Sequence, residues 1–334
     1  MRRRTAARRV AVAFACALVL LGALAAALGI LQATGRSNLV QAFLPAFDGV
    51  ATVGEDGRVV FHDGVRYRQR ASMTSVLLMG HDGRQTDELN GQVDFIMVAA
   101  IDADSGKTTL IYVPRDTMAE VRRTFGHSDE YADTVTMQIA AAFAYGSDFE
   151  HSAERMCATV SKVLFNVPLN YYFLLDVNGV GPLADAVDGV QLRSIEDVPK
   201  TDMKEGEWLD LRGESARLYV TERDTHEAWS AGKRLERQKQ FVDEYARKLA
   251  EVVRSNPQAA LGVLDSVSDC SLTNLGPSEV AYLASLFART GIDDMDVVTL
   301  PGESTYNEET GYEEYHVDAA AALQLVLDVY YEPE

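Results

Sequence analysis

Cysteine is scarce in this chain, which has three in 334 residues, at positions 16, 157 and 270. None of them forms a CxxC pair or stands in a cluster with histidines, so the sequence gives no sign of a structural zinc site. Cys16 lies inside a long apolar run, which leaves one pair for the rest of the chain. Cys157 and Cys270 either form a disulfide or are two separately buried thiols, and the sequence leaves both alternatives open.

Basic residues are also few. The chain has 31 lysines and arginines against 50 aspartates and glutamates, which gives a net charge of −19. Six of the arginines lie in residues 1–36, where there is no acidic residue, so the remainder carries 25 basic and 50 acidic side chains. A surface this acidic repels the phosphates of nucleic acids, which argues against a nucleic acid as the partner.

One stretch near the N-terminus has no charge at all. Val10 to Leu31 is a run of 22 residues without a charged side chain or a proline. A helix needs roughly 20 such residues to cross a bilayer. The alternative is a cleaved signal peptide, but its apolar core is usually shorter, about 7–15 residues. We therefore favour a transmembrane helix over residues 10–31.

The charges that flank this run predict its orientation. The arginines in residues 1–9 precede the span, and basic flanks stay in the cytoplasm. The expected protein is a single-pass cell-membrane protein with a cytoplasmic tail at residues 1–9 and a connector at residues 32–58. Its main domain at residues 59–331 would be extracytoplasmic, and no internal repeat or boundary divides it. The sequence contains no GxSxG motif, so it gives no sign of a serine hydrolase of that type.

Thr74 to Thr117 is the most informative stretch. Three apolar runs rich in β-branched residues, Ser75–Met79, Val93–Ile101 and Thr108–Val113, predict buried strands. Asp102 to Lys107 has turn chemistry, so the second and third runs should form an antiparallel hairpin. A turn centred between residues 104 and 105 places Asp94 opposite Arg115.

Charged side chains follow the ends of these strands. Asp82, Asp94, Arg115 and Asp116 are expected to gather at one end of one sheet. Carboxylates beside an arginine suit a divalent metal and a phosphate. The alternative is a surface ion pair together with ordinary turn residues.

The remaining pattern predicts an α/β fold with a central mixed sheet covered by helices on both faces, because strands alternate with helices. A hairpin around Asp63-Gly64 should extend the edge of that sheet. Residues 122–134 are polar and lack a clear period, so a surface loop is expected there. A helix over residues 138–145 is expected to begin at a cap formed by Thr134 or Thr136 and to end at Gly146.

A long helix is predicted from about Arg234. Its apolar residues recur every three or four positions, and Arg234 and Gln238 lie on the same inward face. Polar groups on that face at a helix N-terminus favour the binding of an anion. The alternative is an arginine at the edge of the helix, with its charged end in water.

Six segments taken together resemble the LytR-CpsA-Psr family over roughly residues 72–250. They are LLMGHD, GQVDFIMVAAID, TTLIYVPRDT, AAAFAYG, LRGESARLYVTER and RLERQ. The resemblance implies a phosphotransferase that moves a glycopolymer from a polyprenyl-pyrophosphate carrier to peptidoglycan outside the membrane. It also implies a magnesium ion (Mg2+) on the pyrophosphate, an arginine-lined head-group site and a long apolar tunnel for the lipid tail.

The family's site residues can be matched to positions of this sequence. The resemblance implies Asp82 and Asp94 as metal ligands, and Asp94, Arg115, Asp116 and Arg223 as catalytic residues. It implies Arg115, Arg223, Arg234 and Gln238 as substrate-binding residues.

Three positions depart from the family pattern. Gln92 and Thr221 stand where the family usually has arginine, and Gln138 stands where lysine is common. Three cations of the usual phosphate clamp are therefore missing. Besides an active ligase, the sequence allows a variant that mainly cleaves the pyrophosphate, a catalytically weak protein that binds polyprenyl-pyrophosphate lipids, or a purely structural anchored domain.

Overall fold

The computed structural model describes residues 32–40, 52–53, 58–81, 83, 90–224, 230–256, 259–290 and 295–334. The predicted membrane span, Val10 to Leu31, and the predicted metal ligand Asp82 lie outside the described residues. Among the residues that are described, no helix is long and apolar enough to cross a bilayer.

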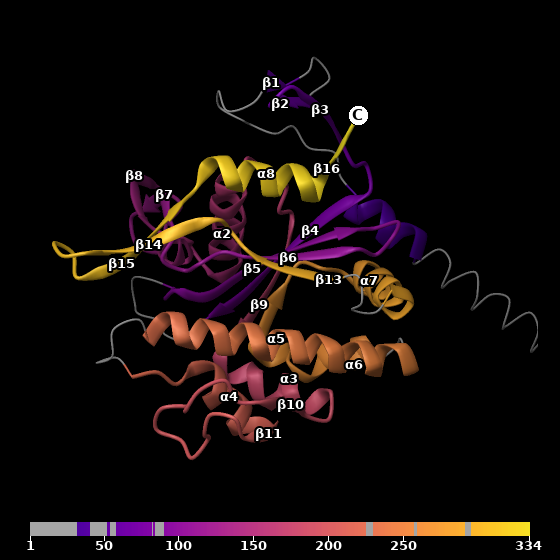
Figure 1. Cartoon of the computed structure of the whole chain (residues 1–334), viewed down its shortest axis with the longest axis vertical. Helices are drawn as coiled ribbons and strands as arrows, with labels where there is room; N and C mark the ends of the chain where they lie inside the picture. Colours follow the sequence, from indigo (N-terminus) through magenta and orange to yellow (C-terminus); the bar gives the residue numbers. More distant parts are fainter. Residues whose placement is uncertain are drawn as a thin grey trace, which may run out of the picture.

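A six-stranded mixed sheet forms the centre of the molecule (Figure 1). Two of its neighbouring pairs, β9 with β4 and β6 with β13, are parallel, and the other three are antiparallel. In spatial order the strands are β12 (Ser271–Thr273), β9 (Tyr171–Asp176), β4 (Met73–His81), β5 (Val93–Asp102), β6 (Thr108–Tyr112) and β13 (Met295–Thr299).

The predicted hairpin of β5 and β6 is confirmed. Ile101 pairs with Thr108 and Met97 pairs with Tyr112, so the turn is centred between residues 104 and 105. The Asp102 carboxylate accepts hydrogen bonds from backbone groups inside the turn, and Gly106 has a φ of +83° that favours glycine. Continued by three residues past the last pair, this register brings Asp94 beside Arg115.

Helices cover both faces of the sheet, as predicted. Side chains alternate along a strand, so Leu77, Ile96 and Val98 pack in one core cluster with residues of α2 (Phe149–Val163) and α8 (Ala319–Tyr330). Val76, Met97 and Ala99 point to the opposite face, where they meet residues of α5 (Ser230–Ser255) and α7 (Pro277–Thr290). Figure 1 shows α8 on one side of the sheet and α5 on the other.

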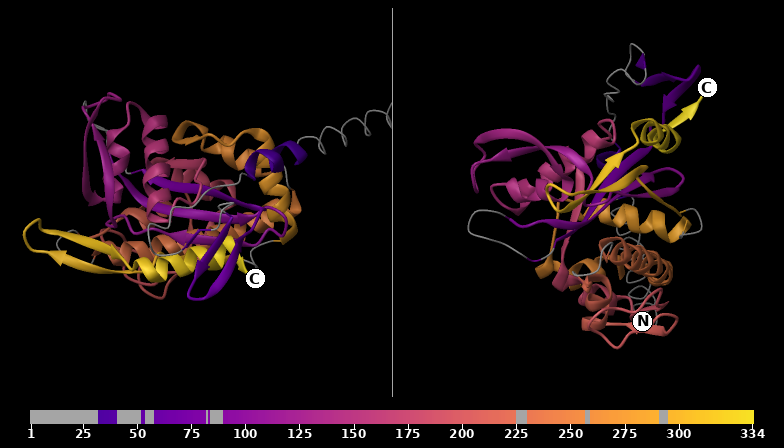
Figure 2. Two further views of the ribbon diagram at one scale, coloured as in Figure 1. Left: turned by 90° about the horizontal axis from the view of Figure 1, so that it is seen from above. Right: turned by 60° about the vertical axis from the view of Figure 1, so that its left-hand side comes forward.

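Shorter helices complete these layers. They are residues 32–39, η1 (Ile139–Tyr145), η2 (Val177–Gly179), α3 (Val180–Ala186), α4 (Gly213–Thr221), α6 (Ala259–Ser266) and η3 (Ser268–Cys270). Several hairpins lie outside the main sheet. Two of them are formed by β10 (Val190–Arg193) with β11 (Trp208–Leu211) and by β14 (Gly302–Asn307) with β15 (Tyr312–Val317). The β14–β15 hairpin projects from the body of the domain (Figure 2).

The N-terminal hairpin exists, but its predicted place at the edge of the main sheet is wrong. Strands β2 (Val59–His62) and β3 (Val65–Gln69) belong to a separate four-stranded sheet with β1 (Thr52–Val53) and β16 (Tyr331–Pro333). The edge of β3 pairs with the last strand of the chain, more than 260 residues later. The local sequence pattern around β3 does not indicate that its partner strand lies so far away in the sequence.

The surface loop predicted at residues 122–134 is also wrong, because most of it lies in a hairpin of β7 (Met118–Thr124) and β8 (Tyr131–Gln138). Ala119 and Val121 are buried while Glu120 and Arg122 are exposed, which is the alternation of a half-buried strand. Thr134 and Thr136 lie in β8, so neither caps the following helix, which is a 3-10 helix without a side-chain cap.

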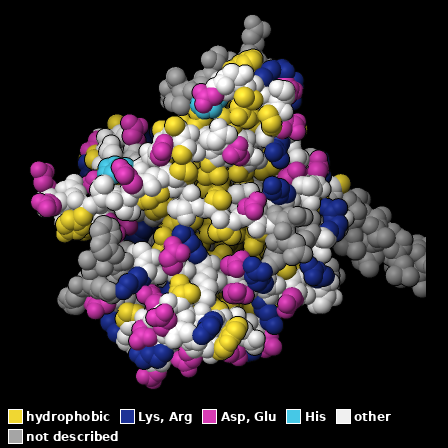
Figure 3. Space-filling model, in the orientation of Figure 1, with side chains coloured by type: hydrophobic (Ala, Val, Ile, Leu, Met, Phe, Trp, Pro, Cys, Tyr) yellow, Lys and Arg dark blue, Asp and Glu magenta, His cyan; other side chains and the backbone are white. Residues whose placement is uncertain are grey.

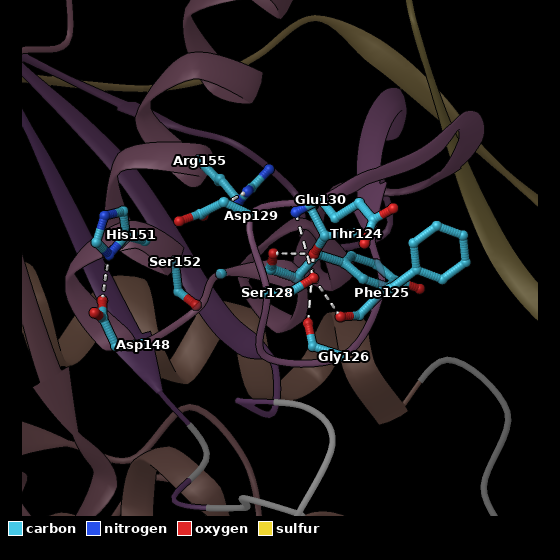
Figure 4. A network of polar contacts seen from close by, with 12 residues as sticks. Thr124, Phe125, Gly126, Ser128, Asp129, Glu130, Asp148, His151, Ser152 and Arg155 are labelled. Carbon is cyan, nitrogen blue, oxygen red and sulfur yellow. Dashed lines mark hydrogen bonds and ion pairs between the residues drawn. The ribbon is translucent and has the colours of Figure 1, made fainter.

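Polar contacts hold the tip of this hairpin against α2 (Figure 4). Ser128 Oγ donates to the Phe125 carbonyl over 2.6 Å, and Arg155 of α2 lies 3.3 Å from the Asp129 carboxylate. The Asp148 side chain caps α2 by accepting from the backbone N–H of His151. Cys157, in the middle of α2, is buried and free, and Cys270 is free as well, so there is no disulfide between them.

Candidate functional site

One carboxylate joins two arginines at the end of the central sheet. Arg115 Nη1 donates to Asp94 Oδ1, and Arg234 Nη1 of α5 donates to Asp94 Oδ2 over 3.1 Å. Arg234 is only 7% exposed, which contradicts the alternative of an arginine whose charged end lies in water. Arg115 also donates to Gln92 Oε1 over 3.0 Å. The predicted meeting of Asp94 and Arg115 at one end of the sheet is therefore confirmed, and Arg234 joins them.

Asp116 completes this cluster. Its Oδ1 lies 3.4 Å from Arg115 Nε and accepts a hydrogen bond of 2.9 Å from Gln138 Nε2. Burial raises the pKa of Asp116 and outweighs the opposing effect of Arg115 and Arg234. Asp116 thus keeps its proton to a higher pH than an exposed aspartate, which makes its carboxylate a better proton acceptor.

Arg223 approaches the same cluster from the loop that follows α4. Burial lowers the pKa of its guanidinium, and the positive charges of Arg234 and Arg115 lower it further. Among the residues that the structure describes, no carboxylate forms an ion pair with Arg223. Counted over the described residues alone, the cluster holds three guanidinium groups and two carboxylates, an excess of positive charge that favours an anion.

Two residues of α5 hold the backbone that leads to Arg223. Arg237, which is 1% exposed, donates to the carbonyls of Tyr219 and Glu222, and its Nε donates to Glu196 over 2.7 Å. Gln238 Nε2 donates to the carbonyl of Val220 over 3.0 Å. The three carbonyls lie at the C-terminal end of α4, where backbone carbonyls lack partners within the helix.

The role of Arg237 was not predicted from the sequence. The only signal was its place in RLERQ, three residues after Arg234 and so on a neighbouring face of the helix. Gln238 also lines the cavity described below, and its predicted role as a substrate ligand stays a prediction. The start of α5 differs from the prediction too: the helix begins at Ser230, so Arg234 lies in its second turn rather than at its N-terminus.

An apolar cavity of about 870 Å³ opens at this cluster. Its mouth includes Asp94, Arg115, Arg223 and Arg234, and its walls come from one face of the sheet and from α3, α5, α6 and α7. Typical wall residues are Val76, Leu78, Phe173, Val242, Leu249 and Leu283. Figure 3 shows apolar side chains gathered across the middle of the molecule, above the charged outer side of α5. A cavity of this size is at the upper end of the range for ligand sites.

The donor set bears on the predicted magnesium ion. Within the described ranges, no three His, Cys, Asp or Glu side chains converge in a way that could hold a metal. Both oxygens of Asp94 already accept from arginines, although each keeps a second lone pair. Magnesium is often held by one or two carboxylates together with substrate phosphates. Asp94 therefore fits a magnesium ion that takes most of its ligands from the phosphates of a bound substrate.

Comparison with known proteins decides the family. The sequence model of the LytR_cpsA_psr family matches residues 51–327. The chain belongs to the LytR-CpsA-Psr family. The resemblance seen in the sequence motifs is therefore confirmed.

Individual members of the LytR-CpsA-Psr family are distant from this chain. A Bacillus mycoides protein named polyisoprenyl-teichoic acid–peptidoglycan teichoic acid transferase TagU is 25% identical over 253 residues, which cover 75% of this chain and 76% of that protein. A Bacillus anthracis protein of the same name is 31% identical over 125 residues, or 37% of this chain. That match spans only 36% of the relative's own length.

Solved structures share the LytR-CpsA-Psr fold. Bacillus subtilis TagV superposes with a TM-score of 0.62 and 20% identity, over 78% of this chain and 96% of TagV. A structure of TagT bound to LI-WTA superposes with a TM-score of 0.56 and 19% identity, over 77% of this chain and 89% of TagT. At such identities the likeness shows the fold alone.

The contacts of Arg237 predict that it positions Arg223. A lysine at this position keeps the charge but cannot reach both carbonyls in the planar fork of a guanidinium. Arg237→Lys should therefore weaken the binding of inorganic pyrophosphate about tenfold, the equivalent of about 1.4 kcal/mol, in an isothermal titration. Arg247→Lys, an exposed position on the same helix, is the matched control and should bind like wild type. A folded Arg237→Lys variant with wild-type affinity would contradict this role.

Proposed function

We propose that this chain is a membrane-anchored phosphotransferase that moves a glycopolymer from a polyprenyl-pyrophosphate lipid to peptidoglycan, outside the cell membrane. The observation that carries this proposal is the arginine cluster at the mouth of a deep apolar cavity. The cavity suits a hydrocarbon chain, which gains free energy when it leaves water. The cluster suits a strongly anionic head group. A pyrophosphate-headed lipid satisfies both at once.

The names of the relatives point in the same direction. The Bacillus mycoides relative is named as a transferase of teichoic acid from a polyisoprenyl carrier to peptidoglycan, and TagT was solved with LI-WTA bound. We transfer the reaction class to this chain and leave the identity of the glycopolymer and of the acceptor sugar open.

The proposed reaction is a displacement at phosphorus. A sugar hydroxyl of peptidoglycan attacks the phosphorus that carries the glycopolymer. The bond from that phosphorus to the bridging oxygen breaks, and polyprenyl phosphate leaves with the electron pair. The proton of the hydroxyl passes to a carboxylate, either Asp116 or Asp94. Arg115, Arg223 and Arg234 stabilise the negative charge that grows on the leaving oxygen.

Magnesium, when bound, would neutralise part of the pyrophosphate charge and orient the two phosphates. Asp94, together with Asp82, would hold it on the protein side. The arginines would then bind the phosphate oxygens that the metal leaves open.

The three side chains that depart from the family pattern are neutral, and each forms a hydrogen bond in this structure. Gln92 accepts from Arg115, Gln138 donates to Asp116, and Thr221 Oγ1 donates to the carbonyl of Arg217. None of these side chains supplies a positive charge to a phosphate. This observation favours a second candidate function, a catalytically weak or pyrophosphatase-type family member that binds polyprenyl-pyrophosphate lipids.

Restoring the cations separates the two candidates. The double variant Gln92→Arg with Thr221→Arg should raise the rate, since one transition-state donor is typically worth about 2.7–4 kcal/mol, or about 10²–10³-fold. The measurement is release of polyprenyl phosphate from a short-chain analogue, with and without an acceptor glycan. Arg115→Ala should abolish binding and turnover, and Arg247→Ala is the control. If Arg115→Ala binds and turns over the analogue like wild type, the site is wrong.

Asp116 gives a prediction about pH and stability. Since burial raises its pKa, the folded protein binds the proton more tightly than the unfolded chain, so ionised Asp116 costs stability above that pKa. Asp116→Asn removes this cost and keeps an oxygen for Gln138. We expect an unchanged or higher Tm at pH 8, and a gain over wild type that shrinks as the pH falls through the raised pKa.

The same variant tests the proton acceptor. If Asp116 accepts the proton, turnover by Asp116→Asn should fall about 10²-fold or more, and wild-type activity should decline as Asp116 becomes protonated in acid. Thermal melts and pH–rate profiles measure the two effects. A variant with wild-type turnover at pH 8 would assign the proton to Asp94 instead.

A further inference from the structure

The helix at residues 32–39 is docked tightly on the domain. A Cβ atom at Gly35 would come within 2.2 Å of the Ser278 carbonyl oxygen, so only glycine allows this close approach. Leu39 is 2% exposed. Arg36 donates to Asp104 Oδ1 from Nε and Nη2, over 2.9 and 2.6 Å. The helix is therefore fixed to the domain and does not act as a free connector.

The elements under this helix also line the far end of the apolar cavity. Its partners lie in the turn between β5 and β6 and at the start of α7. Gly106 and Thr108 of the same turn region line the cavity, as do Leu283 and Phe287 of α7. Tyr282 of α7 donates a hydrogen bond to the Ala103 carbonyl and so connects α7 to the turn. Figure 1 shows residues 32–39 in indigo beside α7, and Figure 2 agrees.

The distance from this end of the cavity to the arginine cluster can be estimated along two elements, β5 and α5. Within strand β5, Asp102 lies eight residues after Asp94, or about 27 Å at 3.4 Å per residue. Arg234 and Val253 of helix α5 both line the cavity, and they lie 19 residues apart, or about 28 Å at 1.5 Å per residue. The two estimates agree, so the cavity has an anionic-head end and an apolar-tail end about 27 Å apart.

No linker residues separate the predicted membrane span from this docked helix in the sequence. The apolar run ends at Leu31, and the helix begins at residue 32. A span over residues 10–31 would therefore end within a residue of the surface formed by helix 32–39, α7 and the β5–β6 turn. No flexible linker would let that surface turn away from the bilayer.

We propose that helix 32–39 holds the tail end of the cavity against the outer surface of the membrane, so that a lipid tail passes from the bilayer into the cavity beside α7. The partner of this surface is the bilayer itself. Residues Val280, Leu283, Ala284 and Phe287 form an apolar stripe on α7 that faces the cavity. The tail then stays in apolar surroundings along the whole route, while the head group sits about 27 Å above the bilayer, where a peptidoglycan acceptor can reach it. This inference rests on the proposed function.

The test lets the domain rotate relative to the predicted membrane span and leaves the docked helix unchanged. A flexible Gly/Ser insert of about 12 residues between Leu31 and Gln32 spans roughly 20 Å and lets the domain turn freely. The full chain is reconstituted in liposomes that contain a long-chain polyprenyl-pyrophosphate glycolipid, and release of polyprenyl phosphate is measured. A water-soluble short-chain analogue is assayed in parallel. The same insert between Asp63 and Gly64, in the β2–β3 turn, is the matched control.

The insert after Leu31 should slow turnover of the membrane-embedded lipid at least about tenfold and leave turnover of the soluble analogue unchanged. The control insert should change neither. Equal rates with the embedded lipid for the wild type and the variant with the insert after Leu31 would overturn the inference while leaving the proposed function intact. A wild type that turns over neither substrate would instead overturn the proposed function, and this inference with it.

Discussion

The carboxylate of Asp94, held between Arg115 and Arg234, is the interaction on which the site depends. The two arginines come from segments far apart in sequence, one at the end of the central sheet and one on α5. Without the carboxylate between them, two guanidinium groups would repel each other, and Arg234 would be a buried charge without its partner. The same contact fixes α5 over the sheet at the mouth of the cavity.

The cavity follows from the way the two faces of the sheet are used. On one face, α2 and α8 pack closely on Leu77, Ile96 and Val98. On the other face, α5 and α7 leave about 870 Å³ beside Val76 and Leu78. Apolar walls that face an empty space lose dispersion contacts. A bound lipid would restore those contacts, so binding of the proposed substrate and stability of the folded domain are coupled.

The sequence predicted those parts of the site that local chemistry determines. The turn from Asp102 to Lys107 sets the register of β5 and β6, so the meeting of Asp94 and Arg115 followed from counting residues. Arg234 was singled out because a basic residue on the inward face of a helix, near its expected N-terminus, favours the binding of an anion. The family motifs then added Arg223, which the structure places beside the other arginines.

Contacts between distant segments were beyond local patterns. Nothing near β3 indicates that its partner is β16, and the charged residues Arg122 and Arg123 hide the alternation of β7. The first turn of α5 was missed because Ser230 to Lys233 carry none of the apolar stripe. The contacts of Arg237 with the end of α4 depend on the angle between two helices, which the sequence does not give.

The central claim is that the arginine cluster and the cavity together hold one pyrophosphate-headed lipid. Native mass spectrometry of the full chain, extracted from its own membranes in mild detergent, tests this most directly. The account predicts one polyprenyl lipid with a phosphate or pyrophosphate head group on each chain. Chains that carry no lipid, or that carry lipids without a phosphate head group equally well, would contradict it.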